Sequence, residues 1–280
     1  MGDNLSFLDR NELESFLQKN NLSPKHSLGQ NFLIDAEVLN SILAAGELNS
    51  HDTVIEIGSG LGVLTRELAK VVAKVVALEF DAETFVALQK NLAAFSNVEL
   101  HQIDVRKFTP PQPPYKLIAN IPYYLTSPIL RQFYSETLHR PEVSVLLIQK
   151  EVAEKICAKE KLSVIALQVK VFAEAEIICT VGKESFLPPP KVKSAVIKLT
   201  LKKTPEIPQS DIEDFFKLLH MGFHSPRKKI GGSIIAGFPF NKDKTLEILA
   251  ASKIDTEKRP EDLAISDWQK LLAAYRKFSQ

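Results

Sequence analysis

The 280-residue sequence has little of what marks several large classes of protein. Its only two cysteines, Cys157 and Cys179, form no CxxC pair and adjoin no histidine cluster. A disulfide framework and a zinc site are therefore not expected. No apolar run reaches the roughly 18 residues that a membrane-spanning helix needs. The acidic start lacks the basic-then-apolar order of a signal peptide. We expect a cytoplasmic protein with no membrane association and no metal.

The sequence also lacks a net charge of the kind that a polyanion-binding tail carries. It has 35 Lys and Arg against 34 Asp and Glu, which gives a formal charge of +1. One stretch differs, because residues 183–203 contain six lysines and one glutamate and so carry +5, which leaves −4 for the rest of the chain. Charge concentrated in this way can contact phosphates even in a protein of neutral total charge. The stretch is a first indication of a nucleic-acid partner.

What the sequence does contain is an alternation of short β-branched strands with segments of helical periodicity. The predicted strands are residues 53–58, 74–79, 97–104, 116–121 and 143–150. The predicted helices are residues 32–46, 61–72, 81–92 and 126–134. Such alternation is typical of an α/β fold, with a parallel sheet covered on both faces.

The pattern changes in the second half of the chain. Residues 175–181 and 193–201 predict a pair of strands that completes the sheet, and from residue 210 the chain is predicted to be helical. We place a domain boundary near residue 205. This divides the chain into an α/β domain over residues 1–204 and a small all-α domain over residues 205–280.

A glycine-rich turn, EIGSGLG over residues 56–62, follows the first strand of this alternation and opens a helix. Gly58 begins the turn, and Glu79 follows 21 residues later at the end of the next strand. A carboxylate at that place can accept hydrogen bonds from both ribose hydroxyls of a nucleoside. Asp104, at the end of the third strand, can meet an adenine amine. These groups predict a nucleoside-containing cofactor, although an incidental tight turn is the alternative.

The spacing of the glycines distinguishes between two such cofactors. A dinucleotide is favoured by GxGxxG, which brings the pyrophosphate to a helix N-terminus. Here the third glycine, Gly62, comes one residue early, and no nicotinamide-site constellation is apparent. The turn therefore favours S-adenosylmethionine over NAD.

The motif NIPYY, residues 120–124, lies at the end of the fourth predicted strand. An aromatic exocyclic amine is a poor nucleophile because its lone pair is delocalised into the ring. A site that methylates it should accept both amine hydrogens, and Asn120 offers a side-chain carbonyl while Ile121 offers a backbone carbonyl. Tyr123 supplies a ring on which a flipped base can stack. The alternative is that Pro122 and the tyrosines only shape a loop.

Several segments together resemble the rRNA adenine dimethyltransferase family. They are KHSLGQNFLID (25–35), VIEIGSGLGVLT (54–65), LEFD (78–81), IDV (103–105), NIPYYLTSPIL (120–130) and FLPPPKVKSAVIKL (186–199). The resemblance is greatest to the bacterial small-subunit members, which dimethylate two adjacent adenines in a 3′-terminal hairpin loop. It implies a Rossmann-like methyltransferase catalytic domain, S-adenosylmethionine as cofactor, and a helical C-terminal domain that binds RNA.

Matched by motif, the resemblance also implies site residues. Those for the cofactor are Asn31, Leu33, Gly58, Glu79, Asp104 and Asn120. Those for catalysis are Asn120, Pro122, Tyr123 and Phe186. Those for RNA are Arg227, Lys228 and Lys229.

Within this set, Phe186 is expected to close the face of the adenine opposite Tyr123, unless it is only a packed phenylalanine of the hairpin. Two positions depart from the family pattern. Ser59 stands where proline is common, and Phe80 stands where an aliphatic residue is usual. Neither departure removes a polar group that the chemistry uses.

The expected activity is the dimethylation of two adenines in small-subunit rRNA within an immature 30S particle, during ribosome biogenesis, by a monomeric enzyme. The sister activity on large-subunit rRNA, of the antibiotic-resistance type, is the nearest alternative. DNA adenine methylation is more distant, because an NxPY motif alone would permit it. A non-catalytic ribosome assembly factor is the alternative from another class.

Overall fold

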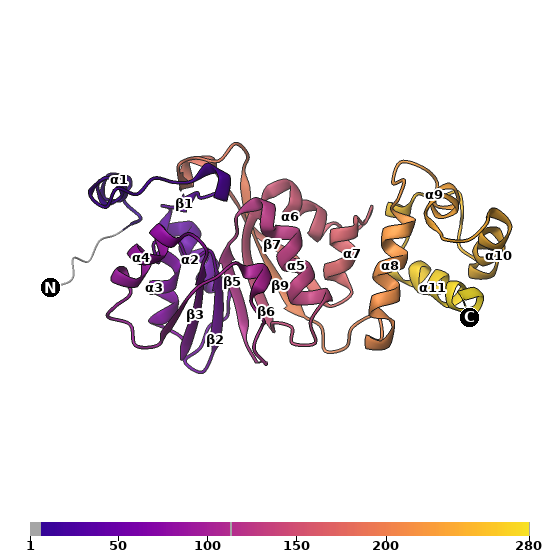
Figure 1. Ribbon diagram of the computed structural model, residues 1–280, viewed down its shortest axis with the longest axis horizontal. Helices are drawn as coiled ribbons and strands as arrows, with labels where there is room; N and C mark the ends of the chain where they lie inside the picture. Colours follow the sequence, from indigo (N-terminus) through magenta and orange to yellow (C-terminus); the bar gives the residue numbers. More distant parts are fainter. Residues whose placement is uncertain (1–6, 113, 280) are drawn as a thin grey trace. The chain divides into compact units, whose positions relative to one another are not determined.

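The computed structural model describes residues 7–112 and 114–279, which form two compact units (Figure 1). The first unit contains the described residues up to Glu154 together with Ala175–Leu201, and the second contains Lys155–Glu174 together with the described residues from Lys202 onward. The junction after Leu201 lies close to the predicted boundary near residue 205. The segment Lys155–Glu174 differs from the prediction, since it clusters with the C-terminal helices. Its Phe172 carbonyl accepts from the Lys202 N–H, and the Phe172 ring lies 6.2 Å from that of Phe216.

The first unit is built on a seven-stranded sheet in the order β4-β3-β2-β5-β6-β9-β7. Its strands are β2 Thr53–Ile57, β3 Lys74–Glu79, β4 Val98–Gln102, β5 Lys116–Asn120, β6 Val143–Gln149, β7 Ala173–Val181 and β9 Ser194–Leu201. The pairs β4-β3, β3-β2, β2-β5 and β5-β6 are parallel, and β9 runs antiparallel to β6. The α/β prediction is confirmed, and β7 and β9 are neighbours as expected.

Helices cover both faces of this sheet, and its central strands β2, β3, β5 and β6 are accordingly buried on both sides. The helices of the first unit are α1 Arg10–Lys19, α2 Ala36–Ala45, α3 Val63–Ala69, α4 Ala82–Asn91, α5 Thr126–Leu130 and α6 Lys150–Cys157, whose last three residues belong to the second unit. On one face, apolar residues of α2 and α3 form a core with alternate residues of β2, β3, β5 and β6, and α4 packs beside them on β4. On the other face, Tyr134 follows α5 and its hydroxyl lies 2.7 Å from Ser144 Oγ of β6.

The N-terminal segment departs from the helix predicted over residues 32–46. Phe32–Leu33 form a short strand, β1, that pairs antiparallel with β8, Phe186–Leu187. The helix α2 begins only after Asp35, whose side chain accepts from the N–H groups of Glu37 and Val38 as an N-cap. The partner of β1 lies more than 150 residues away in the sequence, so periodicity within residues 32–46 could not reveal it.

The described part of the second unit is largely helical. Its further helices are α7 Val164–Lys170, α8 Ile212–Gly222, α9 Ile230–Gly237, α10 Lys242–Ser252 and α11 Ile265–Ser279. Trp268 is fully buried in its core, where the ring stacks on Phe223 at 5.6 Å. Gly222 leaves room for that ring, because a Cβ there would come within 2.4 Å of Trp268. Across the described chain, no helix combines the length and the apolar character needed to cross a membrane.

Candidate active site

A pocket opens at the carboxyl ends of β2, β3 and β5, entirely within the first unit. Its volume is about 1210 Å³, including the open mouth. All of the predicted cofactor and catalytic residues line it: Asn31, Leu33, Gly58, Glu79, Asp104, Asn120, Pro122, Tyr123 and Phe186. Crevices at the carboxyl edge of open parallel sheets are the usual ligand sites of such folds, and the structure brings these residues together there.

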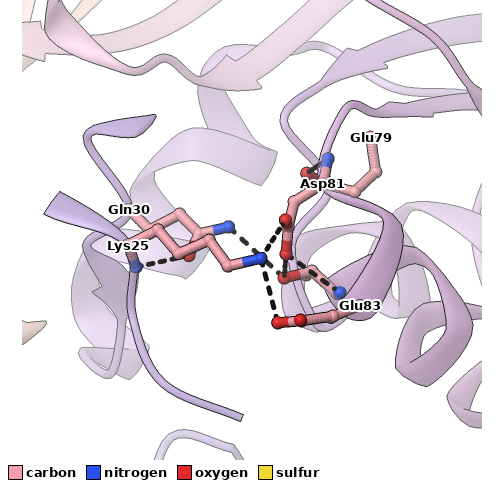
Figure 2. Close-up of polar contacts among 6 residues, drawn as sticks. Lys25, Gln30, Glu79, Asp81 and Glu83 are labelled. Atoms are coloured by element: carbon pink, nitrogen blue, oxygen red, sulfur yellow. Dashed lines mark hydrogen bonds and ion pairs between the residues drawn. The ribbon is translucent and has the colours of Figure 1, made fainter. Parts of the chain in front are cut away.

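The glycine turn forms the pocket floor and holds Glu79 in place. Gly58 and Gly60 have φ values of 73° and 57°, which residues with a Cβ rarely adopt. The Gly60 N–H donates to Glu79 Oε2 at 2.9 Å. The Asp81 N–H donates to Oε1 at 2.8 Å, as Figure 2 shows. A carboxylate has about four acceptor positions, so Glu79 keeps acceptor capacity for a ligand hydroxyl beside its backbone donors.

Burial also changes the ionisation of Glu79. The residue is 7% exposed, and this burial raises the pKa of its carboxyl above the usual range. The backbone N–H groups of Asp81, Gly60 and Phe80 oppose that rise because their hydrogen bonds stabilise the charged form. A ligand hydroxyl that donates to the carboxylate would act in the same direction as these donors.

Asp104 lies two residues beyond the end of β4, on the pocket wall. Its carboxylate accepts two hydrogen bonds from Arg106, one from Nε at 3.0 Å and one from Nη2 at 2.5 Å. The guanidinium lowers the pKa of Asp104. Arg106 lines the same pocket, although the sequence did not predict it as a site residue. The Asp104 carboxylate, predicted to meet an adenine amine, therefore already accepts hydrogen bonds from a guanidinium.

The N-terminal segment supplies one wall of the pocket through residues 28–33. In this wall the Asn31 carbonyl accepts from Asn120 Nδ2 at 3.2 Å. A carbonyl can only accept, so it determines which end of the Asn120 amide faces it. The Nδ2 group turns toward the N-terminal segment, and Oδ1 remains as the acceptor of the amide.

The predicted reactive motif begins with Asn120, the last residue of β5, and continues into a 3₁₀ turn, Tyr123–Leu125. The Tyr123 hydroxyl lies 2.7 Å from Ser194 Oγ, the first residue of β9, and Ser194 is fully buried. Burial raises the pKa of Tyr123, so the phenol is neutral at physiological pH. The bond to Ser194 restrains the ring at the pocket wall.

Phe186 lines the pocket from β8 but is only 1% exposed. Its ring belongs to the core that α2 and α3 form on the sheet. Phe186 is therefore a core residue as well as part of the wall, and its stacking on a base stays a prediction.

Three further pocket residues were not assigned from the sequence. Glu56 is 2% exposed, Thr65 Oγ1 donates to it at 2.5 Å, and burial raises the pKa of its carboxyl to about 7. The signal for Glu56 was a lone carboxylate inside the apolar strand TVIEI. Phe80 and Tyr124 line the pocket but are more than half exposed, which leaves their rings open to a ligand.

The predicted RNA-binding residues lie in the second unit. Arg227, Lys228 and Lys229 are exposed in the turn before α9, and Lys229 forms an ion pair with Glu257. The lysines of the stretch 183–203 divide into two kinds. Lys198 forms an ion pair with Glu47, and Lys202 forms one with Glu206. The other four are exposed: Lys183, Lys191, Lys193 and Lys203.

The donor and acceptor set fits S-adenosylmethionine. Glu79 offers fixed acceptors for a ribose, the glycine turn leaves space beside the backbone, and Phe80 offers an exposed aromatic face after Glu79. An aromatic face beside a carboxylate suits an adenosine. The pocket is mostly apolar in its other residues, as ligand sites commonly are.

Solved structures share this architecture. A dimethyladenosine transferase from Plasmodium falciparum is 28% identical and superposes with a TM-score of 0.76, over 89% of this chain and 98% of that one. The 23S rRNA methyltransferase ErmE is 25% identical with a TM-score of 0.68, over 87% and 99% of the two chains. Fold and site define a Rossmann-like methyltransferase that uses S-adenosylmethionine.

Sequence comparison defines the family more closely. The ribosomal RNA small subunit methyltransferase A of Dehalococcoides mccartyi (strain BAV1) is 39% identical over 91% of this chain and 89% of its own length. The protein of that name from Listeria monocytogenes serotype 4a is 37% identical over 88% and 89%. The profile of the ribosomal RNA adenine dimethylase family matches residues 21–277. The chain belongs to this family.

Proposed function

We propose that the protein dimethylates the exocyclic amines of two adjacent adenines in the 3′-terminal hairpin loop of small-subunit rRNA, within an immature 30S particle in the cytoplasm. One observation carries the proposal: Asn120 and Tyr123 border the same pocket as Glu79 and the glycine turn. A base-binding group and a nucleoside-binding group thus share one cavity. The names of relatives at 34–39% identity favour the small subunit as the source of the RNA.

The role of the chain in transfer is to hold the amine and to localise its lone pair. Asn120 Oδ1 and the Ile121 carbonyl accept the two amine hydrogens, so the nitrogen can become pyramidal. Tyr123 stacks on the adenine that has left the RNA stack, as base-modifying enzymes require. Bound S-adenosylmethionine supplies an electrophilic methyl group on a sulfonium.

No strong base is needed before transfer. The amine nitrogen forms its new bond to the methyl carbon as the bond between that carbon and sulfur breaks, so a neutral thioether would be the leaving group. The nitrogen is then cationic and loses a proton to water. Catalysis is therefore largely alignment, together with polar acceptors fixed in advance. A second methyl transfer to the same nitrogen needs room for the first methyl group, so the pocket should be roomier than a site for single methylation.

Binding of the RNA is proposed to use two basic surfaces. Exposed lysines of the stretch 183–203 flank the pocket residue Phe186 in the sequence, and Arg227 to Lys229 form a second cluster in the second unit. Contacts of lysine and arginine to phosphates give affinity and register but little base information. Adenines in a loop can be splayed out of the stack, which suits the pocket.

The direct test is methyl transfer from labelled S-adenosylmethionine to immature 30S particles, with 50S particles and duplex DNA in parallel. The modified nucleoside is identified by mass. Dimethyladenosine confined to the small-subunit RNA is the expected result. Asn120→Ala removes the proposed acceptor and should lower kcat by about 10²-fold to 10³-fold.

A matched control uses an asparagine elsewhere in the first unit. Asn49 bonds to Asp52 on an exposed turn outside the pocket, so Asn49→Ala should keep wild-type activity. Label in 50S particles would move the assignment to the resistance-type sister activity. Cofactor binding without transfer to any substrate would identify an assembly factor.

A further inference from the structure

The N-terminal wall of the pocket belongs to residues 25–35, which are attached to the rest of the first unit at both ends. At its C-terminal end, β1 pairs with β8, the Ile34 N–H donates to the Ser185 carbonyl at 2.9 Å, and Ser185 Oγ donates to Asp35 at 2.7 Å. At its N-terminal end, no strand pairing is present among the described residues around Lys25. Side chains make the attachment there.

Lys25 makes that attachment. Its Nζ lies 2.5 Å from Asp81 Oδ1 and 2.9 Å from Glu83 Oε2, at the start of α4 (Figure 2). The side chain of Gln30 lies alongside, with Oε1 accepting from the Lys25 N–H at 2.8 Å and Nε2 donating to Thr84 at 3.3 Å. The segment is thus fastened to the turn that follows β3.

The turn after β3 that Lys25 contacts also binds the Glu79 side chain. Asp81 is nearly buried, and its side chain accepts from the Thr84 N–H and hydroxyl as the N-cap of α4. Its backbone N–H donates to Glu79 Oε1. One ammonium group therefore ties this wall of the pocket to the turn that carries the Glu79 carboxylate.

Between these two attachments lies the contact to the reactive residue. The Asn31 carbonyl accepts from Asn120 Nδ2 and so decides that Oδ1 is the free end of the amide. If the segment moves away, nothing in that wall keeps the amide from rotating. A displacement of about 1 Å at a reacting group is enough to slow transfer strongly.

From these contacts the structure assigns Lys25 as a positioning residue: its ion pairs with Asp81 and Glu83 fasten residues 25–31 so that the Asn31 carbonyl orients the Asn120 amide. The kinetic part of this inference rests on the proposed function. The cofactor-binding part does not, because Asn31 and Leu33 also line the cofactor pocket.

The test compares Lys25→Met with Lys74→Met. Lys74 makes a similar ion pair, 2.6 Å to Glu99, at the opposite end of β3 and outside the pocket. Two quantities are measured: the Kd of S-adenosylmethionine by calorimetry, and kcat on 30S particles at saturating cofactor. Lys25→Met should weaken cofactor binding about threefold to fivefold and lower kcat about tenfold. Lys74→Met should change neither.

Two further variants separate positioning from general stability. Lys25→Arg keeps the charge and should restore most of kcat. Asp81→Asn keeps the N-cap acceptor and removes one of the two charges that pair with Lys25, so it should show part of the loss of Lys25→Met, and the double variant should be no worse than Lys25→Met alone. Melting temperatures identify any loss that comes from unfolding.

The outcomes are distinct. An unchanged Kd in Lys25→Met overturns the fastening of the segment, and an unchanged kcat at saturating cofactor overturns the orientation of Asn120. Additive losses in the double variant overturn the pairing with Asp81. A wild-type protein that binds the cofactor but methylates no RNA refutes the proposed function, and the fastening is then judged on the Kd alone.

Discussion

The two edges of the parallel sheet carry the same kinds of side chain and use them differently. At the carboxyl edge, Glu79 and Asp104 line an open pocket, where backbone N–H groups hold Glu79 and the exposed Arg106 pairs with Asp104. At the amino edge, Lys116 Nζ lies 2.9 Å from Asp52 and 2.5 Å from the Glu47 carbonyl, and Lys198 Nζ lies 2.5 Å from Glu47 Oε1. The charged groups at one edge line a ligand pocket, whereas those at the other are buried lysines that pair with oxygens of the chain.

The surroundings of a charged side chain therefore distinguish a binding role from a structural role better than its residue type does. Lys116 and Lys198 are buried and paired, and such pairs contribute little net stability compared with apolar residues of the same shape. Breaking one is costly all the same, because it leaves the partner without its counter-charge. Substitutions at the amino edge should therefore alter stability, and substitutions at the pocket should alter function.

The largest expected effect of this kind is that of Lys116→Met. The substitution removes both contacts of the ammonium group and leaves the Asp52 carboxylate short of a counter-charge. We expect the free energy of unfolding to fall by about 3 kcal/mol, measured by urea denaturation, with kcat unchanged below the melting temperature.

The control for Lys116→Met is an exposed ion pair. Lys70 pairs with Glu67 at 2.6 Å on the surface of α3, so Lys70→Met should cost less than about 1 kcal/mol. A loss of transfer by Lys116→Met at full stability would contradict the separation, since it would mean that the amino edge acts on the pocket.

A second prediction concerns Glu56, the carboxylate of the pocket that the mechanism does not use. Burial raises its pKa from an ordinary 4.5 to about 7. The folded state therefore favours the protonated form, and its stability contribution is complete below pH 4.5 and is lost as the pH rises to about 7. Glu56→Gln keeps a neutral side chain and should not suffer this loss.

The measurement is the free energy of unfolding of both proteins between pH 4.5 and pH 8. The advantage of Glu56→Gln over wild type should grow by roughly 3 kcal/mol across this interval and then stay constant. A difference that is independent of pH would mean that Glu56 ionises in the folded protein at its ordinary pKa.

The sequence predicted the site well where strands end and poorly where distant segments meet. Glu79 and Asn120 end parallel strands, and Asp104 follows one, so their meeting at one edge follows from topology alone. The contact of Lys25 with Asp81 joins residues 56 positions apart, and no local pattern encodes it. The same holds for β1, whose pairing with β8 overrides the helical periodicity after Phe32.

Burial was the other property that the sequence could not supply. Lys193 and Lys198 belong to one basic stretch, yet Lys193 is exposed while Lys198 is 9% exposed and paired. The choice between them depends on which face of β9 meets Glu47. Glu56 was missed although the apolar residues around it indicated burial, because a carboxylate in a strand can also face solvent.

The smallest expected effect sharpens the comparison within this basic stretch. The Lys193 carbonyl accepts from the Lys150 N–H at the carboxyl end of β6, so Lys193 lies at the pocket edge of the sheet, whereas Lys198 reaches the amino edge. Lys193→Gln should weaken binding to immature 30S particles about threefold to fivefold and should lower the slope of log K against log salt by about one. Lys198→Gln should lower the melting temperature and leave that slope unchanged. An equal change of slope in both variants would mean that the internal ion pair of Lys198 opens to bind RNA, and exposure in the free protein would then not identify the lysines that contact phosphate.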